Sequence, residues 1–172
     1  MKSVLVLLVI VGIGLYLGKN GDVLIPDEAI RLRVIANSDS KEDQEVKLLV
    51  RDNISKALYN NIKNTKSVSE ARKSLKRDLP VYKSIVEKTL RENNFDDKYK
   101  IDLGLNYFPE KKYKGVKYNE GYYESMIITL GNGKGNNWWC VLFPPLCLLE
   151  STEEVEEVKY KFFIKEIIDK YF

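Results

Sequence analysis

The sequence predicts an α+β fold in which a small, mostly antiparallel sheet of about four strands packs against helices. Apolar residues recur at every fourth position between residues 46 and 62, which is the pattern of an amphipathic helix. Apolar and polar residues alternate between residues 99 and 107, which is the pattern of a strand with one face in water. The predicted order of strand, helices, three strands and helix is typical of α+β layers.

The first strand and the first helix are predicted between residues 30 and 62. Ile30, Leu32 and Val34 share one face of the strand, and Arg31 and Arg33 project from the other. The helix follows the segment "NSDSKED", in which either Asp39 with Glu42 or Ser40 with Asp43 has the N-cap spacing. Its apolar stripe contains Val46, Val50, Ile54, Leu58 and Ile62.

Two further helices are predicted between residues 67 and 92. Ser67 and Glu70 have the capping-box spacing. An apolar stripe follows at Val68, Ala71, Leu75 and Leu79. Pro80 is tolerated only in the first turn of a helix, so it marks the start of a third helix. The residues of that helix expected to face inward are Tyr82, Ile85, Val86 and Leu90.

The remaining elements are three strands and a final helix. After the strand at 99–107, residues 109–121 are rich in Lys, Gly, Tyr and Asn and are interpreted as an exposed loop. The segments "YYESMIITL" and "WWCVLF" are strands, joined by "GNGKGNN" as a hairpin-like loop. Ser151 and Glu154 form a third capping box before a helix with the stripe Val155, Val158, Phe162, Ile167 and Tyr171.

The N-terminus predicts export from the cytoplasm. Lys2 precedes an uncharged apolar run from Val4 to Gly18, which resembles the core of a signal peptide. The run spans only about 22 Å as a helix, less than the ~30 Å of a hydrocarbon core, and no A-x-A cleavage site follows it. Residues 1–22 are therefore predicted to be a signal peptide or a membrane anchor with a linker, and residues 23–172 a single domain. The alternative is a buried N-terminal helix, which the lack of a polar face disfavours.

Composition excludes several classes of function. The chain has no histidine, which removes Ser-His-Asp and Cys-His catalysis and histidine-based metal sites. Two cysteines cannot close a zinc site, and we expect no cofactor. The net charge of +3 is too small to indicate a nucleic-acid partner.

Two charged groups have alternative interpretations. Asp39, Glu42 and Asp43 can bind a divalent cation or form an acid/base pair, but helix capping explains them without a ligand. Arg31 and Arg33 can bind a carboxylate or another anion, or they can pair with acidic residues of the chain itself.

The segment "NWWCVLFPPLC" contains both tryptophans and both cysteines of the chain. Trp138 and Trp139 are neighbours on a strand, so one is expected in the core and the other is either covered or a binding anchor. Cys140 and Cys147 either form a disulfide or stay reduced. Asn37 and Ser38 are expected to shape the corner after the first strand. The candidate partner contacts are Trp138, Trp139, Phe143, Leu146, Arg31, Arg33, Asn37 and Asp39.

Two long motifs resemble a known family. "IRLRVIANSDSKEDQEVKLLVRDNI" and "NWWCVLFPPLC" are similar to segments of stage II sporulation protein R of endospore-forming bacteria, in the same order and spacing. The likeness runs from about Ile25 to Leu148. The loop "YFPEKKYKGVKYNEGYYES" departs from it, because it lacks the proline-glycine turn of the family.

The resemblance implies a signalling protein and not an enzyme. Such a protein is made in the forespore and exported into the space between the two sporulation membranes, as a secreted or N-terminally anchored chain. There it activates a membrane-bound aspartic protease that processes the pro-sigma factor of the mother cell. The alternative function is a small extracytoplasmic hydrolase that uses carboxylates such as Asp39 and Glu42.

Overall fold

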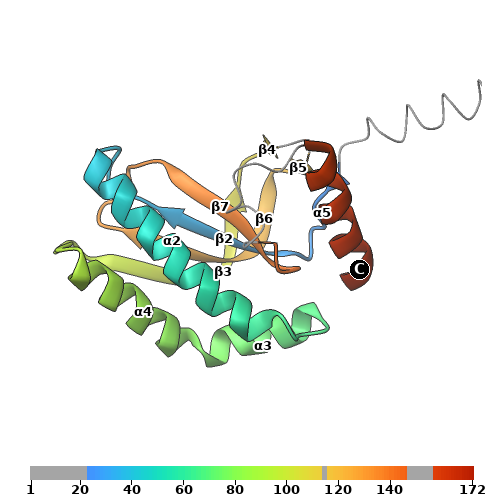
Figure 1. Ribbon diagram of the computed structural model, residues 1–172, viewed down its shortest axis with the longest axis horizontal. Coiled ribbons are helices and arrows are strands. Elements are labelled where there is room, and N and C mark those ends of the chain that lie inside the picture. Colours follow the sequence, from blue (N-terminus) through green and yellow to red (C-terminus); the bar gives the residue numbers. More distant parts are fainter. Residues whose placement is uncertain (1–22, 114–115, 147–156) are drawn as a thin grey trace, which may run out of the picture.

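The protein is built on a four-stranded mixed sheet with three helices on one face (Figure 1). The structure, a computed structural model, describes residues 23–113, 116–146 and 157–172. The strand order is β3 (Tyr99–Phe108), β6 (Gly121–Leu130), β2 (Ile30–Ile35) and β7 (Asn137–Phe143). Only the β2–β6 pair of this sheet is parallel, so the expected α+β class and mostly antiparallel sheet are confirmed.

The helices begin where the capping residues predict. Helix α2 (Lys41–Ile62) has Ser40 as its N-cap, whose side chain accepts a hydrogen bond from the Asp43 amide. This selects the Ser40–Asp43 alternative over Asp39–Glu42. Helix α3 (Val68–Arg77) begins after Ser67, which accepts from the Glu70 amide, and α4 (Leu79–Glu92) carries Pro80 in its first turn.

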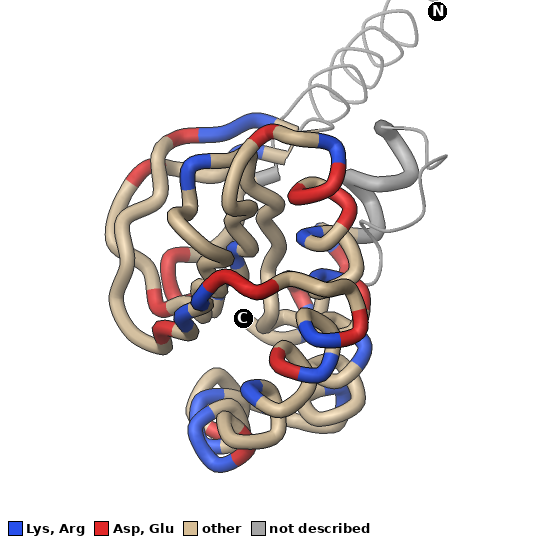
Figure 2. Tube along the Cα trace, turned by 90° about the vertical axis from the view of Figure 1, so that its left-hand side faces the viewer, with Lys and Arg blue, Asp and Glu red and all other residues tan. Residues whose placement is uncertain are grey.

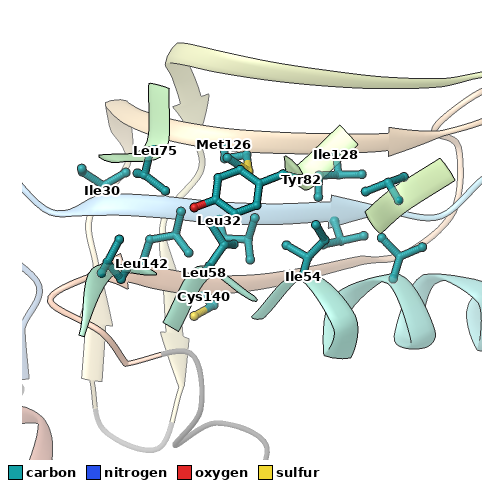
Figure 3. Close-up of a cluster of buried hydrophobic side chains, with 14 of the residues drawn as sticks. Ile30, Leu32, Ile54, Leu58, Leu75, Tyr82, Met126, Ile128, Cys140 and Leu142 are labelled. Atoms are coloured by element: carbon teal, nitrogen blue, oxygen red, sulfur yellow. The ribbon is translucent and has the colours of Figure 1, made fainter. Parts of the chain in front are cut away.

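The main hydrophobic core lies between this helical layer and one face of the sheet (Figure 3). The predicted stripe of α2 is buried throughout, as are Tyr82, Val86 and Leu90 of α4. These side chains meet Ile30, Leu32 and Val34 of β2 and alternate residues of the neighbouring strands. Burial of this much apolar surface is the main driving force that holds the helices on the sheet.

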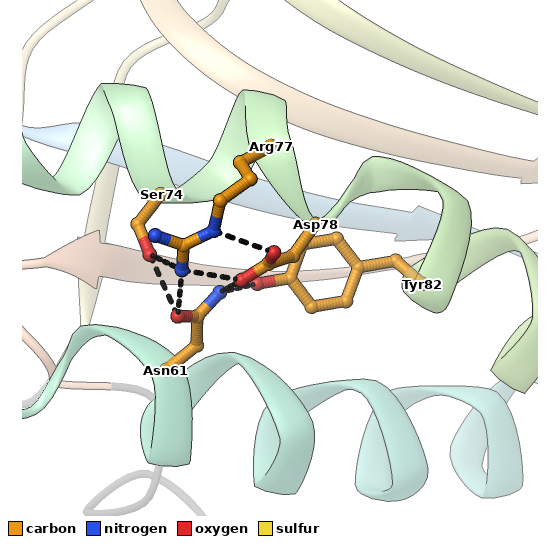
Figure 4. Close-up of polar contacts among 5 residues, drawn as sticks. All are labelled: Asn61, Ser74, Arg77, Asp78 and Tyr82. Atoms are coloured by element: carbon orange, nitrogen blue, oxygen red, sulfur yellow. Dashed lines mark hydrogen bonds and ion pairs between the residues drawn. The ribbon is translucent and has the colours of Figure 1, made fainter.

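A polar cluster ties α2 to the junction of α3 and α4 (Figure 4). The Asn61 side-chain amide donates to Asp78 at 2.5 Å and to the hydroxyl of Tyr82, and its carbonyl accepts from Ser74 at 2.6 Å. Arg77 pairs with Asp78 at 2.8 Å. Because Tyr82 is otherwise buried, Asn61 supplies the partner that its hydroxyl needs inside the core.

The connection between β6 and β7 is not the hairpin that the sequence predicted. Strand β2 lies between these two strands, so residues 131–136 cross the end of β2 instead of joining neighbours. The crossing extends the pairing of β2 with β7, because the amides of Lys134 and Gly135 donate to the carbonyls of Asn37 and Ala36. The sequence predicted the length of the loop between β6 and β7 correctly. It could not predict that β2 lies between these two strands, because strand pairing is not a local property.

Residues 109–121 form structure, which corrects their interpretation as an exposed loop. Strands β4 (Lys111–Tyr113) and β5 (Val116–Tyr118) pair with each other, and β5 also pairs with β1 (Val23–Leu24). Val116 and Tyr118 are buried in a second hydrophobic cluster with Ile25, Ala29, Val141, Leu146 and Ile164. Three-residue strands with exposed lysines are too short to show a clear alternation, which is why the pattern failed.

The C-terminal helix α5 (Glu157–Tyr171) packs beside the second cluster. Ile164 is buried there, and the Tyr171 ring lies 5.0 Å from that of Phe143. The predicted capping box at Ser151 and Glu154, with Val155, lies outside the described residues. So does the apolar segment 1–22, and within the described ranges no helix is long and apolar enough to cross a membrane.

The crossing of residues 131–136 predicts a strong requirement for glycine at position 135. A Cβ on Gly135 would meet the backbone carbonyl of Ser38 and lie 2.9 Å from the Ala36 Cβ. Gly135→Ala is therefore expected to lower the free energy of unfolding by about 1–3 kcal/mol, as overpacking does. Urea unfolding followed by circular dichroism measures this.

Gly104→Ala is the matched control, because a Cβ there has no neighbour within 4 Å. Its effect is expected to stay within about 0.5 kcal/mol. Equal stability losses for the two variants would show that the crossing is not tightly packed.

Candidate functional site

The structure brings together the two segments that contain most of the predicted site residues. Strand β2 and the corner after it pair with residues 134–143 along the whole length of β2. Arg33 lies opposite Trp139 in this register, and Val34 lies opposite Trp138. The candidates Arg31, Arg33, Asn37 and Asp39 are therefore neighbours of the tryptophan segment, although about 100 residues separate them in sequence.

Asn37 and Asp39 hold the crossing loop in place. The Asn37 carbonyl oxygen Oδ1 accepts from the Asn132 amide at 2.9 Å, and its Nδ2 donates to Asp43 at 3.0 Å. Asp39 Oδ1 accepts from the Asn136 amide at 2.6 Å and from the Gln44 side chain at 3.3 Å. Both residues thus have structural partners, and the same hydrogen bonds account for Asp43 without a metal ion.

Lys47 is a buried cation at this corner that the sequence analysis missed. Its Nζ donates to Gln44 Oε1 at 2.6 Å and to the carbonyl of Asn136 at 3.2 Å. Burial lowers the pKa of Lys47, and the neighbouring Arg51 lowers it further. The sequence pattern gave no indication that Lys47 is buried, because a lysine beside an apolar stripe is ordinarily exposed to water.

Trp138 and Trp139 lie on opposite faces of the sheet, as neighbours on a strand must. Trp138 packs against the main core, and the Arg51 guanidinium lies 5.6 Å from its ring centroid. Trp139 is half-buried on the other face, and its ring centroid lies 5.4 Å from that of Phe108 in an edge-to-face arrangement. It lines a pocket of about 140 Å³ together with Lys111, Tyr113, Tyr118, Asn137 and Trp138.

Cations surround the exposed part of Trp139. The guanidinium carbon of Arg33 lies 5.7 Å from the Trp139 ring centroid, and Lys111 Nζ lies 5.0 Å from it. Both distances fall within the range of cation–π attraction. Lys111 and Trp139 line the pocket, whereas Arg33 lies beside Trp139 and Arg31 is buried next to Arg33 on the same strand face. We call these four residues, together with the pocket, the cationic pocket.

Arg31 is the most unusual member of this set. It is 2% exposed, and its guanidinium stacks 3.3 Å from the Tyr123 ring centroid, with Phe108 and Tyr118 within 6 Å. Its Nε, Nη1 and Nη2 have no hydrogen-bond acceptor in the part of the chain that the structure describes, and neither does Arg33 Nε. Burial lowers the pKa of both arginines.

The alternative that these arginines pair with acids of the chain itself is not realised among the described residues. None of the ion pairs found there includes Arg31 or Arg33. Basic and acidic residues are interspersed along the trace (Figure 2), so the lack of counter-ions is a local property of this face.

The remaining candidates lie beneath the surface. Phe143 and Leu146 are fully buried, so in this conformation they support the surface and are not exposed on it. Strand β7 ends at Phe143, before Pro144 and Pro145, as predicted. Cys140 is disulfide-bonded, while Cys147, the other cysteine in the sequence, lies outside the described residues, so the expected pairing stays a prediction.

These features define a small α+β domain with an aromatic, cationic pocket on the face of its sheet that the three helices leave free. The chain belongs to the stage II sporulation protein R family, whose model matches residues 26–153. The matched region includes both motifs that carry the resemblance, which is thereby confirmed. No solved structure matches the chain.

A curated relative is the stage II sporulation protein R of Bacillus subtilis (strain 168). It is 43% identical to this chain over 145 residues, which is 83% of this chain. The match covers 65% of the relative, so this chain spans somewhat less than two thirds of that protein's length.

The contacts at the corner predict that substitution of Asn37 lowers the stability of the fold more than substitution of Asp39. Asn37→Ala removes the acceptor of the Asn132 amide and a donor to Asp43, so it is expected to lower the free energy of unfolding by about 1–3 kcal/mol. Asp39→Asn keeps a side-chain oxygen for the Asn136 amide and should lower it by about 1 kcal/mol or less. Chemical unfolding of both variants measures this, and a larger loss for Asp39→Asn would contradict the assignment.

Proposed function

We propose that this chain is an exported signalling protein of endospore formation that binds and activates a membrane-bound aspartic protease. The protease would then process the pro-sigma factor of the mother cell. Membership of the stage II sporulation protein R family supports a role in sporulation. Export is supported by the apolar run after Lys2, and a forespore origin and a location between the two membranes follow from the family resemblance.

The observation that carries the binding part of the proposal is the cationic pocket. A half-buried tryptophan flanked by two cations is the kind of site that anchors a protein partner, since Trp and Arg dominate binding energy at interfaces. The pocket combines apolar walls with hydrogen-bond donors from Lys111 and Asn137. A receptor segment with complementary charge would therefore find both contact area and orientation there.

The alternative of a carboxylate-dependent hydrolase receives no support from the geometry. Asp39 accepts two hydrogen bonds that fix the loop, and Asp43 accepts from the side chains of Asn37 and Ser38. No cluster of three or more acidic or cysteine ligands is found in the described ranges. We therefore propose a signalling role without catalysis of its own.

Export is tested with a reporter fusion. Residues 1–30, fused to a reporter that is active only outside the cytoplasm, are expected to give activity because the apolar run directs translocation. Replacing two leucines of the run by lysine is the matched control and should silence the reporter. A silent parent fusion that is normally expressed would contradict export.

Activation is tested by co-expression in a non-sporulating host. The chain, the candidate protease and its pro-sigma substrate together should yield the processed sigma factor, whereas omission of this chain should leave the precursor intact. Immunoblotting of the sigma factor measures this. Absence of processing, despite export and expression of all three proteins, would overturn the proposal.

The same assay separates signalling from hydrolysis. The double variant Asp39→Asn, Glu42→Gln is expected to support processing like the parent, because these carboxylates are assigned no chemistry. Complete loss of processing in a double variant that unfolds at the parental temperature would favour the hydrolase.

A further inference from the structure

We propose that the cationic pocket binds a single carboxylate group, supplied by an acidic side chain of the protein partner. Arg33 and Lys111 would contact the carboxylate, and Arg31 would add a buried positive charge beneath them. This inference rests on the proposed function, because it names the chemistry that the partner presents. It goes further in assigning a ligand class and three residues to a site.

Arg33 and Lys111 reach the same place from different parts of the fold. Arg33 projects from the central strand β2, and Lys111 comes from β4 of the small sheet. Both lie within 6 Å of the Trp139 ring centroid, and no ion pair of either is found among the described residues. Lys111 is exposed, so water screens part of the repulsion between the two cations, and an anion near both would convert it into attraction.

Arg31 makes the absence of an anion more costly. It lies two residues before Arg33 on the same strand face, so the two side chains are neighbours. Stacking on Tyr123 stabilises the cation, but an aromatic face cannot accept the five N–H bonds of a guanidinium in its plane. Burial of a charge without hydrogen-bond acceptors is unfavourable, and the ring contacts of Arg31 offset only part of that loss.

The chain's own acids near this face are occupied or too far away. Glu110 pairs with Lys117 at 3.1 Å. Asp27 accepts from the Tyr123 hydroxyl at 3.4 Å, and its charge offsets part of the lowering of the Arg31 pKa by burial, but no ion pair joins Asp27 to Arg31 among the described residues. Asp102 is aligned with Arg33 across the sheet but lies two strands away, at a spacing of about 10 Å. A carboxylate from outside the described chain is therefore the group that these cations lack.

The shape of the site favours a protein carboxylate over a membrane surface. The pocket holds about 140 Å³, and its lining includes the aromatic residues Tyr113, Tyr118 and Trp139. This volume suits one carboxylate on a short side chain, and the aromatic walls exclude water and strengthen its attraction to the cations. A lipid surface would instead require several exposed cations in one plane.

The site is tested on the full chain with a blocked peptide that carries one carboxylate. Acetyl-Gly-Glu-Gly-amide is titrated against the chain labelled with ¹⁵N, and the indole N–H of Trp139 and the Nε–H of Arg33 are followed by NMR. Saturable shifts are expected with this peptide, and shifts at least tenfold weaker in apparent affinity with acetyl-Gly-Gln-Gly-amide. Equal responses to the two peptides would overturn the proposal.

Single substitutions to methionine test which residues contact the carboxylate. Arg33→Met should weaken the Glu peptide at least tenfold, Lys111→Met and Arg31→Met at least threefold. Lys83→Met, an exposed lysine of α4 in the helical layer, is the matched control and should change nothing. Unchanged affinity in Arg33→Met would contradict the site.

A stability measurement separates a binding role of Arg31 from a structural one. If the charge of Arg31 stabilises only the complex with a carboxylate, Arg31→Met should unfold at the same or a higher temperature than the parent. The variant should at the same time lose carboxylate affinity. A lower unfolding temperature with parental carboxylate affinity would show that Arg31 serves only to pack against Tyr123.

Two further outcomes keep this inference distinct from the proposed function. Normal processing of the sigma factor by Arg33→Met would overturn the carboxylate contact and leave protease activation intact. Carboxylate binding without any processing by the parent would leave the site and remove the proposed function. Binding to phosphatidylglycerol vesicles that Arg33→Met abolishes, without any response to the Glu peptide, would assign the site to a membrane instead.

Discussion

The fold and the candidate site depend on the pairing of β2 with a strand on each side. Parallel pairing with β6 and antiparallel pairing with β7 make β2 a central strand of the sheet. Its alternating sequence then determines both faces: Ile30, Leu32 and Val34 enter the helical core, and the two arginines must enter the opposite face. A slip of one residue would exchange these sets and place two guanidinium groups under the helices, so the register is strongly specified.

This arrangement buries the positive charge of Arg31 at the centre of the sheet, which is electrostatically unfavourable. Arg31 is as buried as the core leucines, yet none of its nitrogens has an acceptor in the described chain. A methionine or leucine there would fill similar space without that cost, and replacement of buried ion pairs by apolar residues is often neutral or stabilising. Packing therefore does not explain why the position is charged, whereas the proposed acidic partner would. Buried cations of this kind are more informative about function than exposed acids that cap a helix.

Sequence periodicity was sufficient for the helices and for most of the sheet. Capping serines at 40 and 67 and the stripes after them gave helices that the structure confirms, because local hydrogen bonds and one apolar face determine such elements. The connection between β6 and β7 was predicted wrongly, since the pairing partner of a strand is a non-local property. The strands β4 and β5 were missed for a related reason: Val116 and Tyr118 are buried only because β1 and α5 cover them.

The candidate site was predictable in its residues but not in its arrangement. Arg31, Arg33 and Trp139 were singled out from sequence, yet Lys111 was assigned to a loop and Phe143 and Leu146 were expected at the surface. What the sequence could not supply was the position of the small sheet, which brings Lys111 to Trp139. Such a contact joins elements about 28 residues apart through packing, and no local pattern encodes it.

The polar corner and the cationic pocket are mechanically linked through β7. Asn37 and Asp39 hold residues 132 and 136, and β7 begins at residue 137, directly after the second of these anchors. Trp138 then packs into the helical core and Trp139 lines the pocket, so one short strand transmits the position of the corner to the binding surface. Residues on a strand that pairs with its neighbour along its length, as β7 does with β2, are positioned more accurately than residues on a loop, which lowers the ordering cost of binding. In the proposed recognition, Asn37 and Asp39 would thus contribute without touching the partner, because they help to set where the indole of Trp139 lies.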